Sequence, residues 1–440
     1  MRLTGTSHIG SQGHLTIGGC DTVELAKTFG TPLYVYDEAL IRENSRRFVK
    51  SFEQSGFAFQ VAYASKAFSC IAMAQLAAEE NLSLDVVSSG ELYTALQAGF
   101  PAERIHFHGN NKSEEELRMA LEAGVGCYVV DNFYEMALLH DLASASGIQV
   151  NVMLRLTPGI EVHTHEYIST GQEDSKFGFG VADGQAMLAI RQALAKTHFN
   201  LLGIHVHIGS QIFDTTGFVE AIKVIREFLD SVRQETGYEV KVLNLGGGFG
   251  IRYTDEDDPV EIETFVETIT QEVAVAWSKR NLPNPEIWIE PGRGIVGNAG
   301  TTLYSVGSIK QIPGIRTYVA VDGGMTDNIR PALYQAKYEA LLANKASMEA
   351  TETVSIAGKC CESGDMLIWD IDLPQVTSGD ILAVLSTGAY GYSMASNYNR
   401  LRRPAVVFVR DGIADLVVER ETYEDLVRHD RKRSVLSNIV

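Results

Sequence analysis

Apolar and polar segments follow one another in a regular order between residues 57 and 293. Eight apolar runs rich in β-branched residues alternate there with eight segments whose apolar positions recur at helical spacing. The apolar runs are FAFQVAYASKA, LSLDVV, RIHFHG, CYVVDN, VNVMLRLTPG, NLLGIHVHIGSQ, VKVLNLGGGFG and EIWIEPGR. Strands that alternate with helices in this way predict a parallel sheet, and eight such units predict an α/β fold of the (β/α)8 TIM-barrel type.

The pattern changes on both sides of this region. After Gly294, short alternating runs such as TTLYSVGSI, TYVAVDGG and AVVFVRDG are separated by Gly, Pro and Asp, which is typical of antiparallel β structure. Residues 1–36 read as turns and short strands. We therefore predict a barrel over residues 37–293, with Asp37 as the N-cap of its first helix. Residues 1–36 and 294–440 are predicted to form one mostly antiparallel β domain, of sandwich or barrel type.

Composition and charge exclude several classes of protein. The 440 residues are 45% hydrophobic and 21% charged, as in a soluble globular protein, and the net charge is −19. No run approaches the ~18 apolar residues of a membrane span, and an acidic surface disfavours nucleic acid. The basic cluster RHDRKR at residues 428–433 reads as a solvated tail rather than a nucleic-acid patch. The opening MRLTGTSHIG lacks the layout of a signal peptide, so we expect a cytoplasmic protein.

The cysteines point away from disulfides and from metal. There are five of them, at Cys20, Cys70, Cys127, Cys360 and Cys361, without CxxC or Cys/His metal spacing. We therefore predict free thiols and no metal site.

The ends of several apolar runs carry reactive or phosphate-binding residues. These are Lys66 after the first run, His205, His207 and Ser210 after the sixth, Gly246, Gly247 and Gly248 after the seventh, and Glu290 and Arg293 after the eighth. A barrel gathers the carboxyl ends of its strands into one rim, so these residues are predicted to be neighbours. A lysine, an imidazole, a glycine run and a carboxylate on one rim are the groups that a site for pyridoxal phosphate needs.

Each residue taken alone has a simpler interpretation. Lys66 could be a surface lysine, although partial burial would favour the neutral amine that a Schiff base requires. The run GGGFG could be a tight turn, or a phosphate site in which backbone N–H groups and a helix N-terminus meet the anion. Glu290 could form a salt bridge with Arg293 or bind the ring nitrogen of a cofactor. For His205 we favour a core histidine.

A long polar segment interrupts the barrel pattern between Gly159 and Val181. It reads IEVHTHEYISTGQEDSKFGFG, where barrel loops are usually about 2–6 residues long. Long loops on the active rim are commonly functional.

Taken in order, the motifs YASKA, HVHIGSQ, GGGFG, EPGR, DGGM, RPALY, CCESGD and TGAYGYSM resemble those of the alanine-racemase-like (fold-type III) pyridoxal-phosphate decarboxylases. The resemblance covers Lys66 to about Arg403. The segment EYISTGQEDSKFGF looks like the diaminopimelate branch of that family. One departure is mild: Ser65 stands where the usual lysine motif, YAVKA, has valine.

The resemblance implies roles for individual residues. The catalytic residues would be Lys66, which joins the cofactor, His207, which packs on its ring, and Cys361, the proton donor. The cofactor-binding set would be Lys66, His207, Ser210, Gly246, Gly247, Gly248, Glu290, Pro291, Gly292, Arg293 and Tyr390. The substrate-binding set would be Arg293, Arg330, Tyr334, Glu362 and Tyr390.

The resemblance also implies a reaction and an assembly. The reaction would be decarboxylation of meso-diaminopimelate to L-lysine, and Cys361 and Glu362 would reach the active site of a partner subunit in a homodimer. Two alternatives stay open. One is a decarboxylase of the same fold that acts on ornithine, lysine, arginine or a carrier-bound glutamyl group. The other is a non-catalytic binding protein, against which the presence of Lys66 and Cys361 argues.

Overall fold

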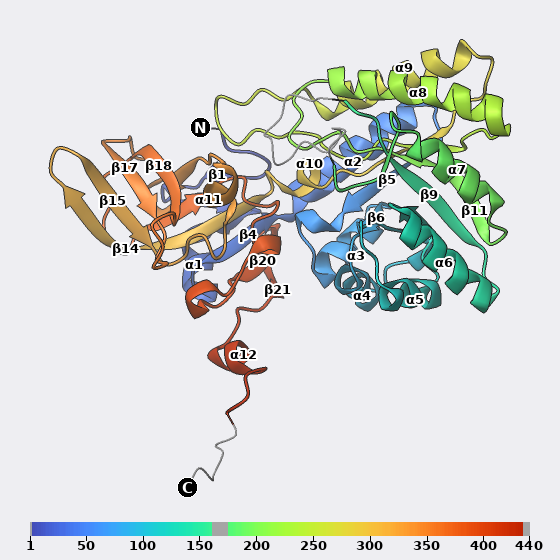
Figure 1. Ribbon diagram of the computed structural model, residues 1–440. Coiled ribbons are helices and arrows are strands. Elements are labelled where there is room, and N and C mark those ends of the chain that lie inside the picture. Colours follow the sequence, from blue (N-terminus) through green and yellow to red (C-terminus); the bar gives the residue numbers. More distant parts are fainter. Residues whose placement is uncertain (1, 161–174, 434–440) are drawn as a thin grey trace, which may run out of the picture. The chain divides into compact units, whose positions relative to one another are not determined.

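The structure is a computed structural model that describes residues 2–160 and 175–433 (Figure 1). Its described residues divide into two compact units. The first draws on Met1–Ser7, Tyr36–Thr301 and Leu385–Ser393, and the second on His8–Val35, Thr302–Val384 and Met394–Val440. Most of the long polar segment noted after Gly159 lies outside the described residues.

The first unit contains a closed barrel of parallel strands. Its sheet runs in the order β10-β9-β11-β12-β13-β5-β6-β7-β8, and β8 also pairs with β9, which closes the ring. The strands are β5 (Phe59–Ala64), β6 (Ser83–Val86), β7 (Ile105–Phe107), β8 (Cys127–Val130), β9 (Val150–Thr157), β11 (Phe199–His205), β12 (Val242–Asn244), β13 (Glu286–Ile289) and the short β10 (Phe179–Gly180) beside β9. Eight of the nine fall on the eight predicted runs, so the predicted (β/α)8 barrel is confirmed.

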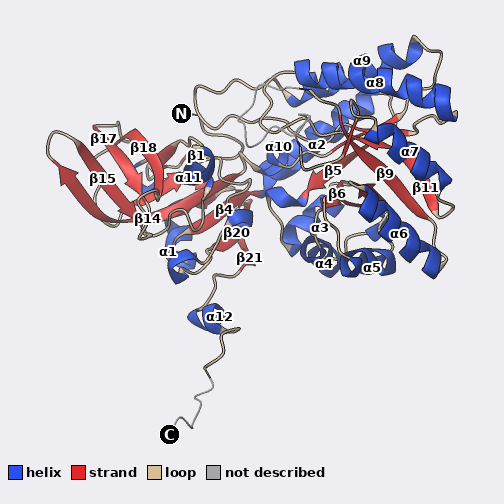
Figure 2. Ribbon diagram, viewed as in Figure 1, coloured by secondary structure: helices blue, strands red, loops and turns tan. Residues whose placement is uncertain are grey.

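Helices surround the barrel strands (Figure 2). They are α2 (Glu38–Ser55), α3 (Ile71–Glu79), α4 (Ser89–Gln97), α5 (Glu114–Ala123), α6 (Phe133–Ser146), α7 (Gln185–Ala195), α8 (Thr216–Thr236), α9 (Ile262–Ser278) and the short α10 (Arg293–Val296). The predicted N-cap of α2 is present, because the Asp37 side chain accepts a hydrogen bond from the Leu40 N–H at 3.2 Å. Helical spacing puts Phe48 and Phe52 of α2 on its buried face.

The barrel interior has an apolar layer and a polar layer. Cys127, Met153, Val242 and Trp288 form a buried cluster on four strands. Side chains two residues apart on a strand point to the same side. On β8 the next inward position is the apolar Val129 of the same cluster, but on the other strands the next inward positions toward the carboxyl ends carry polar groups. These are Asp85, His108, Arg155, His205, Asn244 and Glu290, of which all but Arg155 are fully buried. The polar layer therefore lies at the rim where the βα loops begin.

The second unit is built on a mixed sheet in the order β18-β17-β15-β14-β4-β20-β21, with β19 pairing with β14 and β16. Its strands are β4 (Leu33–Asp37), β14 (Gly300–Ile312), β15 (Arg316–Val321), β16 (Ala340–Leu342), β17 (Glu352–Ala357), β18 (Met366–Leu373), β19 (Ile381–Val384), β20 (Ala405–Arg410) and β21 (Ile413–Val418). The β15–β17 ladder is parallel, whereas the β14–β15, β17–β18 and β20–β21 ladders are antiparallel. The predicted, mostly antiparallel β domain from both ends of the chain is confirmed.

Smaller elements complete the second unit. They are the three-stranded sheet β1 (His8–Ile9), β2 (Leu15–Ile17) and β3 (Cys20–Asp21), and the helices α1 (Thr22–Phe29), α11 (Arg330–Tyr334) and α12 (Tyr423–Val427). The residues of the RHDRKR cluster, 428–433, are all exposed.

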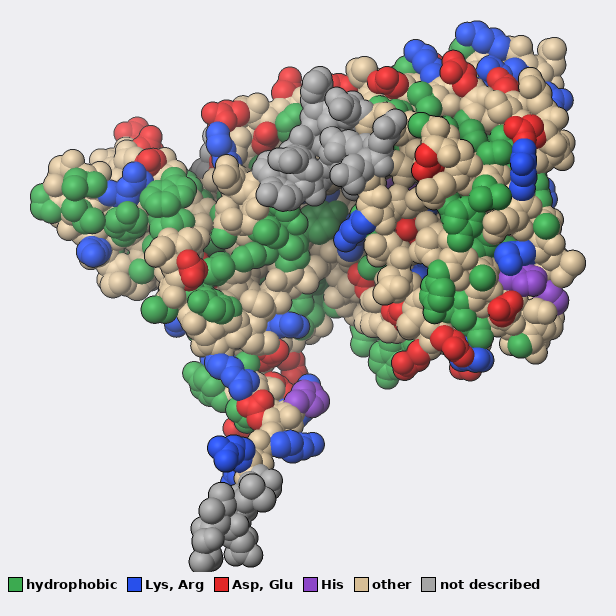
Figure 3. All heavy atoms as spheres, viewed as in Figure 1, with side chains coloured by type: hydrophobic (Ala, Val, Ile, Leu, Met, Phe, Trp, Pro, Cys, Tyr) green, Lys and Arg blue, Asp and Glu red, His purple; other side chains and the backbone are tan. Residues whose placement is uncertain are grey.

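Three further observations concern the surface, the thiols and the helices. On the face shown in Figure 3, acidic and basic side chains are interspersed over the helices of the barrel unit. All five cysteines are free thiols, and three of them, Cys20, Cys70 and Cys127, are buried. Among the described residues, no helix combines the length and the apolar character that crossing a bilayer requires.

Candidate active site

A pocket with an empty volume of about 440 Å³ lies at the carboxyl ends of the barrel strands. It is lined by Ala64, Lys66, His207, Ser210, Gly247, Gly248, Phe249, Glu290, Gly292, Arg293 and Tyr390. All except Ala64 and Phe249 are residues that the sequence analysis singled out. Gly246 and Pro291 are next to lining residues in the chain. The Gly246 oxygen accepts a hydrogen bond from the Glu290 N–H at 2.8 Å, and the Pro291 oxygen accepts one from the Ala64 N–H at 3.2 Å. The structure therefore brings the predicted cofactor-binding residues together.

Lys66 and His207 line this pocket from the ends of different strands, β5 and β11. Lys66 lies in a single 3-10 turn, Ser65–Ala67, directly after β5, and its side chain is exposed. The partial burial that would favour a neutral amine is therefore absent. His207 follows β11, and its Nδ1 accepts a hydrogen bond from the Gly247 N–H at 3.3 Å. Burial, followed by the positive charge of Lys66, lowers the pKa of His207 well below its usual range, so this imidazole is neutral.

The glycine run is required by close backbone approaches. A Cβ on Gly247 would lie 2.3 Å from the backbone oxygen of Glu290, and one on Gly248 would lie 2.6 Å from that of Gly209. Gly246 and Gly248 also have φ values of +69° and +111°, a region that favours glycine. The helix N-terminus expected at this turn does not follow directly, because α9 begins only at Ile262.

Arg293 is buried and faces Ser210, not Glu290. Its Nη2 donates to Ser210 Oγ at 2.8 Å, its Nη1 donates to Tyr253 Oη, and its guanidinium lies 4.8 Å from the ring centre of Tyr390. The Glu290–Arg293 salt bridge considered from the sequence is therefore wrong. Pro291 and Gly292 turn the chain between the two residues, and Arg293 begins α10.

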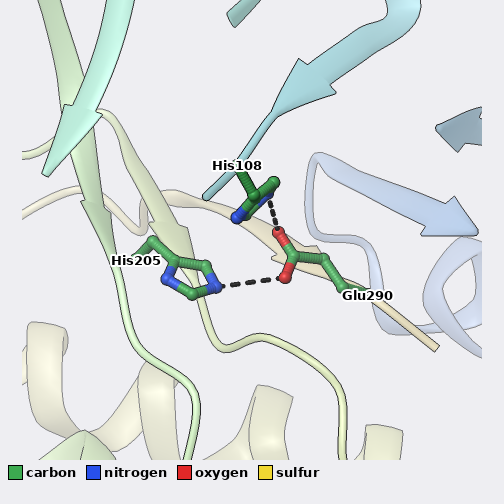
Figure 4. A group of neighbouring side chains, drawn as sticks. All are labelled: His108, His205 and Glu290. Carbon is green, nitrogen blue, oxygen red and sulfur yellow. Dashed lines mark hydrogen bonds and ion pairs between the residues drawn. The ribbon is translucent and has the colours of Figure 1, made fainter. Parts of the chain in front are cut away.

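Glu290 belongs instead to a cluster across the barrel (Figure 4). Its Oε1 lies 2.9 Å from His108 Nε2 and accepts a hydrogen bond from Asn244 Nδ2 at 2.6 Å. Its Oε2 lies 3.0 Å from His205 Nε2. His205 is thus buried, as expected of a core histidine, but its partner is the carboxylate of the pocket.

The charges in this cluster follow from burial and neighbours. Burial opposes ionisation of Glu290, yet attraction by His108 and then by His205 holds the pKa of Glu290 well below its usual range. Burial likewise opposes a charge on His108, but the carboxylates of Asp85 and Glu290 together raise the pKa of His108. Burial lowers the pKa of His205 to about 4. These shifts favour an ionised Glu290, a protonated His108 and a neutral His205.

The same three side chains have the spacing of a metal site. Their donor atoms lie within 4.8 Å of one another, a grouping found nowhere else among the described residues. Each imidazole, however, already contacts a Glu290 oxygen directly at 2.9–3.0 Å. Glu290 is therefore already paired with both imidazoles, by an ion pair to His108 and a hydrogen bond to His205, and we interpret the group as a charge cluster.

The remaining predicted site residues lie in the second unit. Arg330 is buried, with Nη1 donating to Tyr338 Oη at 2.7 Å, and Tyr334 ends the same short helix, α11. Cys361 and Glu362 are exposed.

One carboxylate joins the loops that carry these residues. Asp365 Oδ2 accepts a hydrogen bond from the Cys360 N–H at 2.7 Å, and its Oδ1 accepts one from the Met325 N–H at 2.6 Å. The loop of Cys361 and the loop that leads to Arg330 are therefore tied together within this unit.

Sequence reasoning missed His108, Asn244 and Asp85. Each is a polar residue near the carboxyl end of an apolar strand, at an inward position of the period-two alternation, and that placement was the available signal.

Comparison with known proteins places the chain in a family. Residues 38–297 match the family model for the pyridoxal-binding domain of the pyridoxal-dependent decarboxylases, the class of protein that this barrel and its pocket define. The chain is 65% identical to a diaminopimelate decarboxylase of Bacillus subtilis over 430 residues, 98% of either chain. It is 51% identical to one of Staphylococcus aureus, covering 96% of this chain and 98% of that one.

A solved structure agrees in fold. The diaminopimelate decarboxylase of M. jannaschii, determined in co-complex with L-lysine, is 38% identical, with a TM-score of 0.90 and coverage of 97% of this chain and 98% of that one. The chain belongs to the diaminopimelate decarboxylase family.

Proposed function

We propose that this protein decarboxylates meso-diaminopimelate to L-lysine and CO2, with pyridoxal phosphate as its cofactor. The observation that carries the proposal is the rim pocket, where Lys66, His207, Glu290 and Arg293 meet. It is supported by 65% identity over nearly the whole chain to a protein named diaminopimelate decarboxylase.

The pocket suits an anionic, ring-shaped cofactor. The glycine backbone at residues 246–248 packs too closely on neighbouring backbone to carry a Cβ, and Gly247 and Gly248 line the pocket. Ser210 and Arg293 offer polar groups for a phosphate, and Arg293 Nε is buried without a hydrogen-bond partner. The neutral imidazole of His207 offers a flat face to the pyridine ring of the cofactor, and the anionic Glu290 suits the protonated nitrogen of that ring. Pro291, Gly292 and Tyr390 would complete the cofactor site.

These placements suggest a role for the cofactor and for each of two residues in the reaction. When bound, pyridoxal phosphate supplies an electron sink for the pair left behind as CO2 departs. Lys66 provides the amine that holds the cofactor covalently. Cys361 provides the proton for the carbon that loses CO2, and its side chain is exposed.

The distal end of diaminopimelate is itself an amino acid. A guanidinium matches its carboxylate through paired hydrogen bonds, and a glutamate matches its ammonium group. Arg330 or Arg293, with Tyr334 and Glu362, would supply these contacts, and Tyr390 would contact both substrate and cofactor. A decarboxylase for ornithine or arginine does not need this combination of groups.

The direct test incubates the purified protein and pyridoxal phosphate with meso-diaminopimelate, and in parallel with ornithine, arginine and lysine. We expect lysine and CO2 from diaminopimelate alone, and neither from the Lys66→Ala variant. Turnover of ornithine or arginine in preference to diaminopimelate would contradict the proposed substrate. Failure to convert any of the four would contradict the proposed function.

A homodimer with shared active sites is part of the proposal. If Cys361 and Glu362 act on the partner's substrate, a mixture of Lys66→Ala and Cys361→Ala proteins forms hybrid dimers with one intact site. We expect such a mixture, after dissociation and reassociation, to regain activity that neither variant has alone. A mixture as inactive as its components would place both residues in one subunit's site. A cytoplasmic location and the lack of nucleic-acid or membrane partners stay predictions.

A further inference from the structure

Glu290 is a buried carboxylate that is approached from two sides of the barrel. His205 ends β11, two strands from β13 in the barrel order, and His108 follows β7, three strands away in the other direction. Their Nε2 atoms lie 3.0 and 2.9 Å from different oxygens of Glu290 (Figure 4). Three separate strands thus contribute to a single cluster at the bottom of the pocket.

The two imidazoles make different contacts. The His108 contact is an ion pair whose geometry is not that of an aligned hydrogen bond, so charge attraction dominates it. His205 is hydrogen-bonded to Glu290 through Nε2, and its Nδ1 is buried without a partner. A neutral imidazole with one acceptor left unpaired donates its only proton to the carboxylate.

Glu290 needs both contacts to remain ionised. A carboxylate without a partner in so buried a place takes up a proton, because desolvation penalises the charged form. With His108 and His205 in place, the pKa of Glu290 lies well below its usual range. Asn244 adds a donor at 2.6 Å but no charge.

Resting on the proposed use of pyridoxal phosphate, we propose that His108 and His205 are positioning residues. They keep Glu290 ionised and directed into the pocket, so that the ring nitrogen of the cofactor retains its proton. A carboxylate with low proton affinity leaves the proton on the pyridine nitrogen, and a protonated ring draws electrons more strongly. Neither histidine is among the residues that line the pocket, so both act through Glu290.

Other charged groups of the same layer face this cluster and share its field. They are Lys66 after β5, Asp85 on β6, Asp131 after β8 and Arg155 on β9. Asp85 raises the pKa of His108, whereas Arg155 lowers it. Lys66 and Arg155 together favour the ionised form of Asp85 and disfavour a charge on His207. Among the acidic groups of this layer, Glu290 has an imidazole against each of its two carboxylate oxygens.

The test compares four proteins: the wild type, His108→Gln, His205→Gln and His106→Gln. His106 is a matched control, since it is buried on β7 two residues before His108 and stacks on Trp288 at 4.3 Å. Its Nε2 lies 3.1 Å from Gln60 Oε1. Each protein is loaded with pyridoxal phosphate isotopically labelled at the ring nitrogen. Nitrogen NMR then reports the protonation of that atom as a function of pH, independently of turnover.

We expect the ring nitrogen to be protonated in the wild type and in His106→Gln. In His108→Gln it should lose its proton at a lower pH, and affinity for pyridoxal phosphate should fall roughly tenfold, as for the loss of one charge-assisted contact. His205→Gln should show a smaller change in the same direction. A ring nitrogen that titrates identically in His108→Gln and the wild type overturns the inference.

A second measurement needs no variant of either histidine. In the unliganded wild type, the His108 imidazole should be protonated at neutral pH in histidine-labelled NMR spectra, and in Glu290→Gln it should lose that proton at a lower pH. A neutral His108 in the wild type overturns the inference even if His108→Gln fails to fold. Failure of the proposed function looks different, because the wild type then binds no pyridoxal phosphate and forms no lysine.

Discussion

Replacing Gly247 with alanine tests whether the pocket depends on the close approach of the segments that follow β12 and β13. The added Cβ would lie 2.3 Å from the backbone oxygen of Glu290, whereas ordinary contacts of a Cβ begin at 3.4 Å. The two segments must therefore separate by about 1 Å, and overpacking of this kind costs about 1–3 kcal/mol. The displaced segment carries Glu290, which is anchored by its N–H to the Gly246 oxygen at 2.8 Å.

The expected effect is a loss of cofactor affinity. Because about 1.4 kcal/mol corresponds to a factor of ten in a binding constant, Gly247→Ala should weaken the binding of pyridoxal phosphate by roughly ten- to hundredfold. The assay titrates the unliganded protein with pyridoxal phosphate and follows the absorbance of the bound cofactor. Thermal unfolding of each protein is measured alongside, so that a global loss of folding is recognised.

Gly237→Ala is the matched control. Gly237 ends α8 with a φ of +73°, and a Cβ there would meet nothing within 4 Å. This substitution carries backbone strain of about 1–2 kcal/mol without a steric clash, so it should lower the unfolding temperature and leave cofactor affinity unchanged. If Gly247→Ala binds pyridoxal phosphate as tightly as the wild type, the close approach does not shape the pocket and the reasoning is refuted.

Three further predictions concern buried charge and specificity. Lys112→Met leaves the buried carboxylate of Glu135 without its partner at 2.7 Å, so urea unfolding should show a loss of about 3–5 kcal/mol, and an unchanged midpoint would contradict this. The His108–Glu290 ion pair forms as pH rises past the lowered pKa of Glu290, and it is lost as pH rises through the raised pKa of His108, above 6.5. The affinity of the wild type for pyridoxal phosphate should therefore decline above the pKa of His108. The affinity of His108→Gln, measured over the same pH range, should not show this decline. Glu362→Ala should raise KM for diaminopimelate more than it lowers kcat, and unchanged steady-state kinetics would remove Glu362 from the distal site.

The barrel was predictable because its signal is local. Each strand is a short apolar run, each helix shows its own periodicity, and the order of the two along the chain indicates the sheet. The β domain was predictable in class but not in pairing. The alternation in β15 and β17 is the same whether their ladder is parallel or antiparallel, and the structure makes it parallel.

The candidate site was predictable where chemistry lies at strand ends in recognisable motifs. Lys66, the glycine run and Glu290 were found this way. The partner of Glu290 was not, because His108 lies 182 positions earlier (290 less 108) and meets it only through closure of the barrel. Nearness along the chain suggested Arg293 instead, and the turn at Pro291 directs that side chain to Ser210.

The return of Leu385–Ser393 to the barrel unit bears on the order in which the protein becomes functional during its synthesis. Tyr390 is held beside the lysine turn by its N–H, which donates to the Ala67 oxygen at 2.8 Å, and the Gly388 N–H donates to the Gly297 oxygen at 3.0 Å. A nascent chain released from the ribosome only as far as Thr301 has every barrel strand but not this wall of the pocket. The barrel scaffold can therefore form before Tyr390 is in place to complete the lining of the pocket.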